Sequence, residues 1–256
     1  MRKYFEIFKF ELKSKFNFRV DYFFDLISFA MHVFIFNQLW EFILKGKIVL
    51  GYSRPEIIWY IVIGEMLYNS IGKTYKRISE MIKSGDVANM LTKPISFLKY
   101  IIAQEMSFVI NLAVNFVSAI ILGSIMGGKI EISFMQIVMF SVSLIFAAIL
   151  FVFIQVFIGM LAFVTEENDS YYFVISKGML LLIFTPLEFY PKAISKVLQF
   201  LPTTYAIYPV GKILVHFELE NALRLILFQA LSICVLFIVL NLLNIKGVKN
   251  INVNGG

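Results

Sequence analysis

Apolar stretches separated by short polar segments dominate the chain. Six of them approach the roughly 20 residues that a helix needs to cross the ~30 Å apolar core of a bilayer. They cover about residues 22–42, 56–74, 97–123, 134–164, 171–187 and 222–245. The pattern predicts an all-α, polytopic membrane protein with six transmembrane helices, organised as a single domain over residues 1–256.

The composition favours the same class and excludes several others. Hydrophobic residues make up 59% of the chain and charged residues 16%, against about 45–50% and about 25% in soluble domains. The mean hydropathy is +0.81. A soluble fold of this length would leave much of its apolar surface in water, and one cysteine forms no internal disulfide. Soluble enzymes, disordered chains and disulfide-stabilised domains are therefore excluded.

The distribution of charge predicts the topology. The net charge is +6, and with the N-terminus inside, 15 of the 23 Lys and Arg residues fall on the cytoplasmic side of the predicted spans. This bias predicts that both termini are cytoplasmic. The Phe-, Ile- and Lys-rich composition fits a bacterial cytoplasmic membrane. No segment outside the bilayer is long enough for a nucleic-acid-binding domain, so no nucleic-acid partner is expected.

Residues 1–19 are predicted to form an interfacial helix before the first span. An apolar face is formed by Phe5, Phe8, Leu12 and Phe16, with cations to one side. Such a helix lies on the inner leaflet with its cations toward anionic headgroups, so membrane lipids are an expected partner. The alternative is a frayed basic N-terminus.

The cytoplasmic segment at residues 74–96 has an amphipathic pattern of its own. One face carries Ile71, Tyr75, Ile78 and Ile82, and the opposite face carries Lys73, Lys76, Arg77, Glu80 and Lys83. The second span is therefore expected to leave the membrane and continue as an amphipathic helix.

A turn and a second, very short helix are predicted to follow. Ser84-Gly85 provides a helix stop, Asp86 can cap a helix from Val87 to Leu91, and Pro94 ends it. A topological turn needs less structure than this. The pattern predicts a docking surface for a cytoplasmic partner.

The outer segment at residues 188–221 is rich in proline. Four of the six prolines lie in or next to it, namely Pro186, Pro191, Pro202 and Pro209. Ile194, Val197, Leu198 and Leu201 form one helical stripe, and Val210, Ile213, Leu214 and Phe217 form another after Pro209. Two short amphipathic helices are predicted, each opened by a proline, that rest in the outer interface or re-enter it.

Two motifs and the proline series occur in a definite order along the chain. The motifs are Ile82-Lys83-Ser84-Gly85-Asp86 and Leu91-Thr92-Lys93-Pro94-Ile95, and the series is Pro186, Tyr190-Pro191, Leu201-Pro202 and Tyr208-Pro209. Their order and spacing, with the six-span layout, resemble the ABC-2 family of transporter permeases, in particular a branch of about this length.

The resemblance implies a permease that forms half of the translocation pathway of an exporter for a hydrophobic or amphipathic substrate. A second permease, identical or different, and two cytoplasmic ABC ATP-binding subunits are the implied partners. Those subunits would bind ATP and Mg, so this chain itself is expected to hold no cofactor or metal. The resemblance places ATPase docking on the short helix, at Gly85, Asp86, Val87, Met90, Leu91 and Pro94.

Polar residues inside the predicted spans are candidates for the pathway. Glu65 lies near the middle of the second span, where an acid costs about 2.5–3.5 kcal/mol, and such residues usually face a cavity or a partner. On the third span, Gln104, Ser107, Asn111, Asn115 and Ser118 form one polar stripe. Either these residues line the pathway or they form hydrogen-bonded packing contacts.

Enzyme chemistry is poorly supported. Gly72-Lys73-Thr74 resembles the end of a P-loop, but the position of the required preceding glycine is Leu67, so the chain is not expected to hydrolyse ATP. Glu166-Glu167 resembles part of an intramembrane protease motif, yet the position of the expected arginine is Tyr171, and only His32 and His216 could complete a metal site. The alternatives are a nucleotide-independent secondary transporter or channel, and a scaffold or immunity protein that transports nothing.

Overall fold

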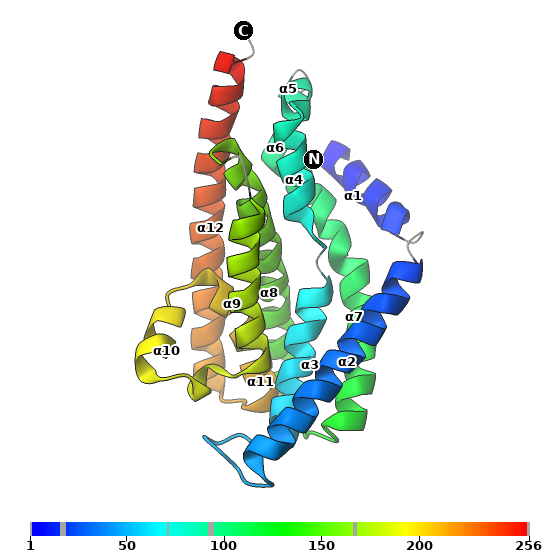
Figure 1. Cartoon of the computed structure of the whole chain (residues 1–256), viewed down its shortest axis with the longest axis vertical. Helices are drawn as coiled ribbons and strands as arrows, with labels where there is room; N and C mark the ends of the chain where they lie inside the picture. Colours follow the sequence, from blue (N-terminus) through cyan, green and yellow to red (C-terminus); the bar gives the residue numbers. More distant parts are fainter. Residues whose placement is uncertain (1, 16–18, 71, 92–94, 166–167, 255–256) are drawn as a thin grey trace.

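The computed structural model is a bundle of helices (Figure 1). It describes all residues except 1, 16–18, 71, 92–94, 166–167 and 255–256. The α-helices are α1 (Arg2–Lys15), α2 (Arg19–Leu44), α3 (Arg54–Ser70), α4 (Thr74–Lys83), α5 (Asp86–Leu91), α6 (Phe97–Glu105), α7 (Val109–Met126), α8 (Phe134–Met160), α9 (Asp169–Phe184), α10 (Lys192–Leu198), α11 (Pro202–Val215) and α12 (Leu219–Asn254). The 3-10 turns are η1 (Met106–Phe108), η2 (Leu161–Phe163) and η3 (Leu187–Phe189). The all-α prediction is confirmed for the described residues.

Among the residues that the structure describes, four helical segments are long and apolar enough to cross a bilayer on their own. They are Phe23–Leu44, Phe97–Met126, Phe134–Phe163 and Leu219–Gly247, which correspond to the first, third, fourth and sixth predicted spans. The other two predicted spans correspond to α3, with 17 residues, and α9, with 16. Both are shorter than the ~20 residues of an ordinary span. The structure supports a multi-pass membrane protein, and the count of six spans stays a prediction.

Helix α3 lies at the centre of the bundle. Every residue from Ile57 to Leu67 is buried, because α2, α7, α8, α9 and α11 all pack against this helix. A helix buried on all sides presents no stripe to lipid or water. Its polar side chains must therefore find their partners within the protein.

Glycines allow two neighbours to approach α3 closely. A Cβ atom on Gly123 of α7 would lie 2.6 Å from the Trp59 ring, and one on Gly211 of α11 would lie 2.4 Å from the Tyr60 ring. Small residues at such crossings let helix backbones approach in a membrane, where apolar association alone gives little driving force. The two aromatic rings of α3 thus fill the space that the missing side chains leave.

Side chains from other helices satisfy the carbonyl groups at the end of α9. The last four carbonyls of a helix have no partner within it, and Pro186 prevents the chain from continuing the helix. The Tyr60 hydroxyl donates to the Leu182 carbonyl at 2.9 Å, and the Trp40 indole donates to the Phe184 carbonyl at 3.0 Å. The end of α9 is therefore tied to α3 and α2.

Two amide side chains satisfy the carbonyl groups at the ends of α11 and α8 in the same way. Gln136 Nε2 donates to the carbonyls of Ile213 and Leu214 at the end of α11, at 3.3 and 2.6 Å. Asn168 Nδ2 donates to the carbonyls of Ile158 and Gly159 at the end of α8, at 2.7 and 3.1 Å. Both amides are buried.

The second span does not continue into the cytoplasmic helix as predicted. Helix α3 ends at Ser70 and α4 begins at Thr74. Lys73 lies outside helical geometry with φ −77° and ψ 57°, and Thr74 N donates to the Gly72 carbonyl at 2.8 Å. A turn at Gly72 and Lys73 therefore separates α3 from α4, and α4 can take its own direction.

The second outer helix begins at Pro202 and not at Pro209, contrary to the prediction. Pro202 opens α11, and Pro209 lies inside it. A proline inside a helix removes the hydrogen bond to the carbonyl four residues earlier, which here belongs to Tyr205. Gln229 of α12 donates its amide to that carbonyl at 3.0 Å. A side chain from another helix thus replaces the lost bond, and α11 continues through the proline.

Helix α1 packs against α6, with which it makes two side-chain contacts. The Tyr4 hydroxyl accepts a hydrogen bond from the Ser96 amide at 3.1 Å, and Gln104 donates to Glu11. Phe5 is exposed, and Phe8 and Leu12 are half-buried. Phe16 lies outside the described residues, so the interfacial placement of residues 1–19 stays a prediction.

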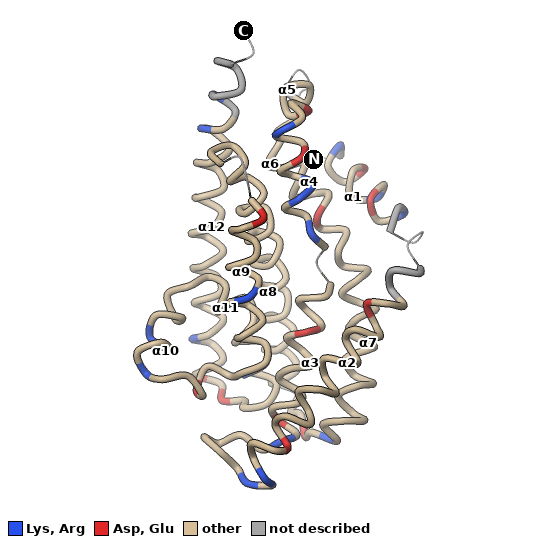
Figure 2. The backbone as a smooth tube through the Cα atoms, viewed as in Figure 1, with Lys and Arg blue, Asp and Glu red and all other residues tan. Residues whose placement is uncertain are grey.

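Charged residues lie mainly toward the two ends of the bundle (Figure 2). Charged residues are sparse along the middle of the helices and collect toward the ends (Figure 2). The C-terminal part of α12, the N-terminus and α5 lie toward one end, and the α2–α3 connection lies at the other (Figure 1). This arrangement is what a bundle crossing an apolar layer requires.

Replacing Gln229 by Leu is expected to destabilise the bundle. Gln229 is fully buried and also exchanges hydrogen bonds with Ser143, accepting at 2.9 Å and donating at 3.1 Å. The variant leaves buried acceptors without donors, at a cost of about 1–3 kcal/mol. Chemical unfolding in detergent measures the loss, with Gln38→Leu at an exposed site of α2 as the control. Equal stability of the two variants would show that Gln229 does not support α11.

Candidate functional site

Helices α4 and α5 form a projecting end of the molecule (Figure 1). The turn between them lies where the sequence predicts it. Gly85 has φ +80° and donates to the Ile82 carbonyl at 3.3 Å, while Ser84 N donates to the Glu80 carbonyl at 2.8 Å. Glycine adopts this left-handed conformation without a steric cost. The turn therefore fixes the direction in which α5 leaves α4.

The short helix α5 presents polar groups outward and one apolar anchor inward. Asp86, Ala88 and Asn89 are exposed, and the Asp86 carboxylate accepts from the Ser84 hydroxyl at 2.8 Å. Val87 is 0% exposed and Met90 is half-buried. Val87 thus holds α5 on the bundle and is not itself available to a partner. Pro94 and the side chain of Leu91 lie outside what the structure describes.

Helix α4 lies directly on α8 and α9. A Cβ atom on Gly159 of α8 would lie 2.6 Å from Cβ of Ile78, so this glycine receives the buried Ile78 side chain. The Tyr75 hydroxyl donates to Asp169 of α9 at 2.9 Å, and its ring stacks on Tyr172 at 4.1 Å. Burial, and then the hydrogen bond to Asp169, raise the pKa of Tyr75, which keeps the hydroxyl a donor.

An ion pair joins α4 to the end of α6. Arg77 pairs with Glu105, which also accepts a hydrogen bond from Thr74. Arg77 is partly exposed and Glu105 is buried. The sequence pattern placed Arg77 on the charged face of this segment and gave it no partner. In the structure its guanidinium pairs with the buried carboxylate of Glu105, because an unpaired buried charge is costly.

A cavity of about 210 Å³ lies beside the start of α4. It opens among α2, α3, α8 and α9, and its polar lining residues are Asp25, Tyr68, Asn69, Lys73, Gln155, Tyr172 and Ser176. Pockets for drug-sized molecules are about 300–1,000 Å³. The cavity is therefore large enough for a polar headgroup and too small for a whole amphipathic molecule.

Glu65 lies next to this cavity, at the centre of the bundle. It is 0% exposed, and its Oε2 accepts from Asn69 Nδ2 at 2.7 Å. Its Oε1 is 3.4 Å from Nδ1 of His32 on α2. Asn69 lines the cavity, so one amide connects the cavity with the buried acid. This geometry is compatible with both predicted roles of Glu65, a residue that lines or gates the pathway and a hydrogen-bonded packing contact.

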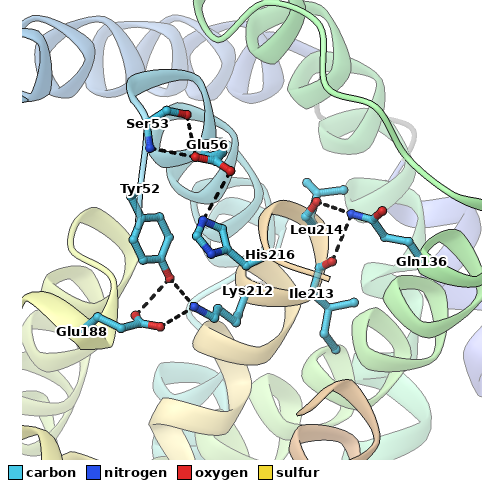
Figure 3. Close-up of polar contacts among 9 residues, drawn as sticks. All are labelled: Tyr52, Ser53, Glu56, Gln136, Glu188, Lys212, Ile213, Leu214 and His216. Atoms are coloured by element: carbon cyan, nitrogen blue, oxygen red, sulfur yellow. Dashed lines mark hydrogen bonds and ion pairs between the residues drawn. The ribbon is translucent and has the colours of Figure 1, made fainter. Parts of the chain in front are cut away.

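A polar network closes the opposite end of the bundle (Figure 3). Glu188 forms an ion pair with Lys212 at 2.5 Å and accepts hydrogen bonds from Tyr52 at 3.0 Å and Tyr208 at 2.8 Å. Burial raises the pKa of Glu188, but Lys212, a backbone hydrogen bond and the Tyr208 hydroxyl together outweigh this effect, and the net pKa is below its ordinary value. Glu188 is therefore ionised at neutral pH and holds the α2–α3 connection to α11.

A comparison with protein families identifies the chain. The sequence model of the family described as ABC-2 family transporter protein matches residues 26–255, a range that begins inside α2 and includes the whole of α12. The chain belongs to the ABC-2 transporter family. Members are membrane subunits of ABC transporters and associate in general with ABC ATPase subunits. No curated protein matches the chain.

The structure places the predicted polar stripe of this ABC-2 protein at packing contacts. Asn115 donates to Ser70 at 3.1 Å, Gln104 donates to Glu11, and Ser118 donates to the Val114 carbonyl of its own helix at 3.2 Å. Asn111 is half-buried. None of these residues lines the 210 Å³ cavity, and their pathway role stays a prediction.

The two histidines lie beside different carboxylates of α3. His32 lies beside Glu65, whereas His216 Nε2 is 3.4 Å from Glu56, at the start of the helix. Nine helical residues, about 13 Å of rise, separate those two carboxylates. Glu166 and Glu167 lie outside the described residues.

Several functional candidates were missed by the sequence reasoning. Gln155 lines the cavity and accepts from the Tyr75 amide at 3.4 Å, and Glu105 pairs with α4. The available signal was a polar residue within a long apolar run. Such a residue is costly in a membrane unless it has a partner, so Gln155 and Glu105 qualified on the same ground as Glu65.

Replacing Gly159 by Ala is expected to push α4 away from α8. The new methyl group meets Ile78, and overpacking of this kind costs about 1–3 kcal/mol. The Ile78→Gly change removes the Cβ atom that the new methyl group meets, so the double variant should be more stable than the sum of the two single effects by about 1 kcal/mol or more. Thermal unfolding of the four proteins measures the coupling.

Gly178→Ala on α9 serves as the matched control, because no atom lies within 4 Å of its Cβ position. It should leave stability unchanged or raise it slightly. Strict additivity of the Gly159 and Ile78 effects would contradict the proposed contact.

The Glu188–Lys212 pair predicts a pH dependence of stability. The folded pKa of Glu188 lies below its ordinary value of 4.5, so its contribution is complete above pH 4.5 and disappears as the pH falls through the lowered value. Glu188→Gln should cost about 1–3 kcal/mol near pH 7, less than a fully buried pair. The difference in unfolding free energy between the two proteins should shrink below pH 4.5. A difference that stays constant down to pH 3 would contradict this assignment.

Proposed function

We propose that this ABC-2 protein is the permease subunit of an ATP-driven exporter and forms half of the translocation pathway for a hydrophobic or amphipathic substrate. In this proposal α2, α3, α6–α7, α8, α9 and α12 cross the cytoplasmic membrane of a bacterium. Both termini and α5 lie on the cytoplasmic side. A second permease completes the pathway, and two partner ATPases bind ATP and Mg.

The observation that carries the proposal is the position of α5. It lies at the end of the bundle with Asp86, Ala88 and Asn89 exposed, and the buried Val87 anchors it. The neighbouring helix α4 also exposes charges, at Lys76, Glu80 and Lys83. A short helix with a polar outer face and a fixed direction suits a docking element better than a membrane contact.

The contacts between α4 and three other helices support the transmission of a movement of α5 into the bundle. Helix α4 contacts α8 where Ile78 packs on Gly159. It also contacts α9 through the hydrogen bond from Tyr75 to Asp169, and α6 through the ion pair of Arg77 with Glu105. Helices α8 and α9 line the 210 Å³ cavity. A displacement of α5 by ATPase closure would therefore reach the cavity through packed side chains, as in a rigid-body transition.

Replacing Gly85 by Val is expected to weaken ATPase association and ATP-dependent transport. A β-branched residue at φ +80° costs about 1–2 kcal/mol, which shifts the population of a docking-competent α5 about 5- to 30-fold. Co-purification of the ATPase subunits and transport in proteoliposomes measure the two effects, and membrane insertion should be unchanged.

Gly46→Val is the matched control. Gly46 has φ +74°, and like Gly85 it has no atom within 4 Å of a Cβ position, but it lies in the α2–α3 connection at the other end. The same backbone strain there should leave ATPase association intact. Equal effects of the two substitutions, or full association of the Gly85 variant, would overturn the docking role of α5.

One observation favours a second function, a proton-driven transporter without nucleotide. Glu65 and His32 place two titratable side chains 3.4 Å apart beside the cavity. The two functions are distinguished by dissipating the proton gradient while ATP is held constant. Under the ATP-driven proposal transport continues in the absence of the gradient and stops without the ATPase subunits, and the opposite result supports the second function.

A further inference from the structure

Two cavities meet where α10, α11 and α12 come together. One has about 460 Å³ and a mainly apolar lining, and the other has about 180 Å³ and a more polar one. Gln199, Tyr205 and Phe228 line both of them. The two therefore form one groove with a polar part and an apolar part, called here the α10–α12 groove.

Helix α12 forms one side of the groove, with a cation at one end and apolar side chains along the rest. Arg224 lines the polar part, and Phe228, Leu231 and Val235 line the apolar part. Their spacing of four, three and four residues keeps them on one face of the helix. The distance along the axis from Arg224 to Val235 is about 16 Å, close to the ~15 Å thickness of one leaflet of the apolar core.

The two cations of the groove have no carboxylate partner among the residues that the structure describes. Lys196 lines the apolar part and Arg224 the polar part, and neither belongs to an ion pair within the described ranges of the chain. Arg224 lies over the Phe228 ring at 5.8 Å. By contrast, Lys212 on neighbouring α11 is neutralised by Glu188. The groove therefore carries a net positive charge, with Arg224 in its polar part and Lys196 in its apolar part.

The apolar wall is open to the surroundings of the protein. Leu231 is 51% exposed, Val235 is 54% exposed and Phe200, at the end of α10, is 86% exposed. In a membrane protein these side chains contact acyl chains, and cations near the interface attract anionic headgroups.

We propose that the α10–α12 groove binds one anionic phospholipid. Its phosphate lies at Arg224 in the polar part, and one acyl chain follows Phe228, Leu231 and Val235. Lys196 adds a second positive charge to the groove. The positive charge of the groove favours an anionic lipid as its occupant over a second copy of this chain. An apolar protein face in the groove would bury two cations without an anion, which is costly. The site does not depend on the proposed transport function.

Native mass spectrometry of the purified full-length chain in detergent tests the headgroup. The chain is titrated with phosphatidylglycerol and with phosphatidylcholine of identical acyl chains. Phosphatidylglycerol is expected to bind at least about tenfold more tightly, and Arg224→Gln is expected to remove most of this preference. Lys192→Gln, which removes an exposed cation of α10 outside the groove, should leave the preference intact. Equal binding of the two lipids, or an unchanged preference in the Arg224 variant, would overturn the proposal.

Filling the groove tests the acyl chain. Leu231→Trp places a large ring in the apolar part and should lower phosphatidylglycerol binding about tenfold. Leu227→Trp, at an exposed residue of α12 outside the groove, should not lower it. Competition by glycerol phosphate or inorganic phosphate as strong as that of the whole lipid would show a simple anion pocket and contradict the proposal. The proposal would also be contradicted if the protein forms a dimer that dissociates in the Leu231→Trp variant and is unaffected by lipid. That result would show that a second copy of the chain occupies the groove.

Discussion

Backbone groups at helix ends and breaks impose the main constraint on this structure. In an apolar surrounding no water replaces a missing hydrogen bond, so each buried carbonyl needs a partner within the protein. Gln136 serves the end of α11, Asn168 the end of α8, and Tyr60 and Trp40 the end of α9. Each of these bonds joins two different segments. The same contacts that satisfy the backbone therefore fix the arrangement of the helices.

The central helix α3 shows how this constraint and packing act together. It is buried on all sides, and glycines of α7 and α11 bring those helices against its aromatic rings. Among the described residues, Glu65 contacts Asn69, one turn further along α3, and His32 of α2. A short helix can hold a polar residue at the centre of a bundle because protein, not lipid, surrounds it.

Much of the fold could be predicted from sequence, because hydrophobic periodicity and turn residues are local signals. They located the apolar helices, the turn at Gly85 and the short helix after it. They failed where a distant residue changes a local rule. Pro209 predicts a helix start, but Gln229 of α12 repairs the break it causes. Arg77 belongs to a charged stripe in the sequence, and only the fold reveals its partner Glu105. Cavity-lining residues such as Gln155 depend on helix packing in the same way.

The repair of α11 by Gln229 has a consequence for biosynthesis. Segments emerge from the ribosome in order from the N-terminus, so α11 is made before the helix that supplies its missing donor. Until α12 is in place, the Tyr205 carbonyl has no partner from Gln229, and α11 cannot reach its final hydrogen-bonded form. The last helix therefore completes a helix that was made before it, and a chain stalled before residue 229 would leave α11 unfinished.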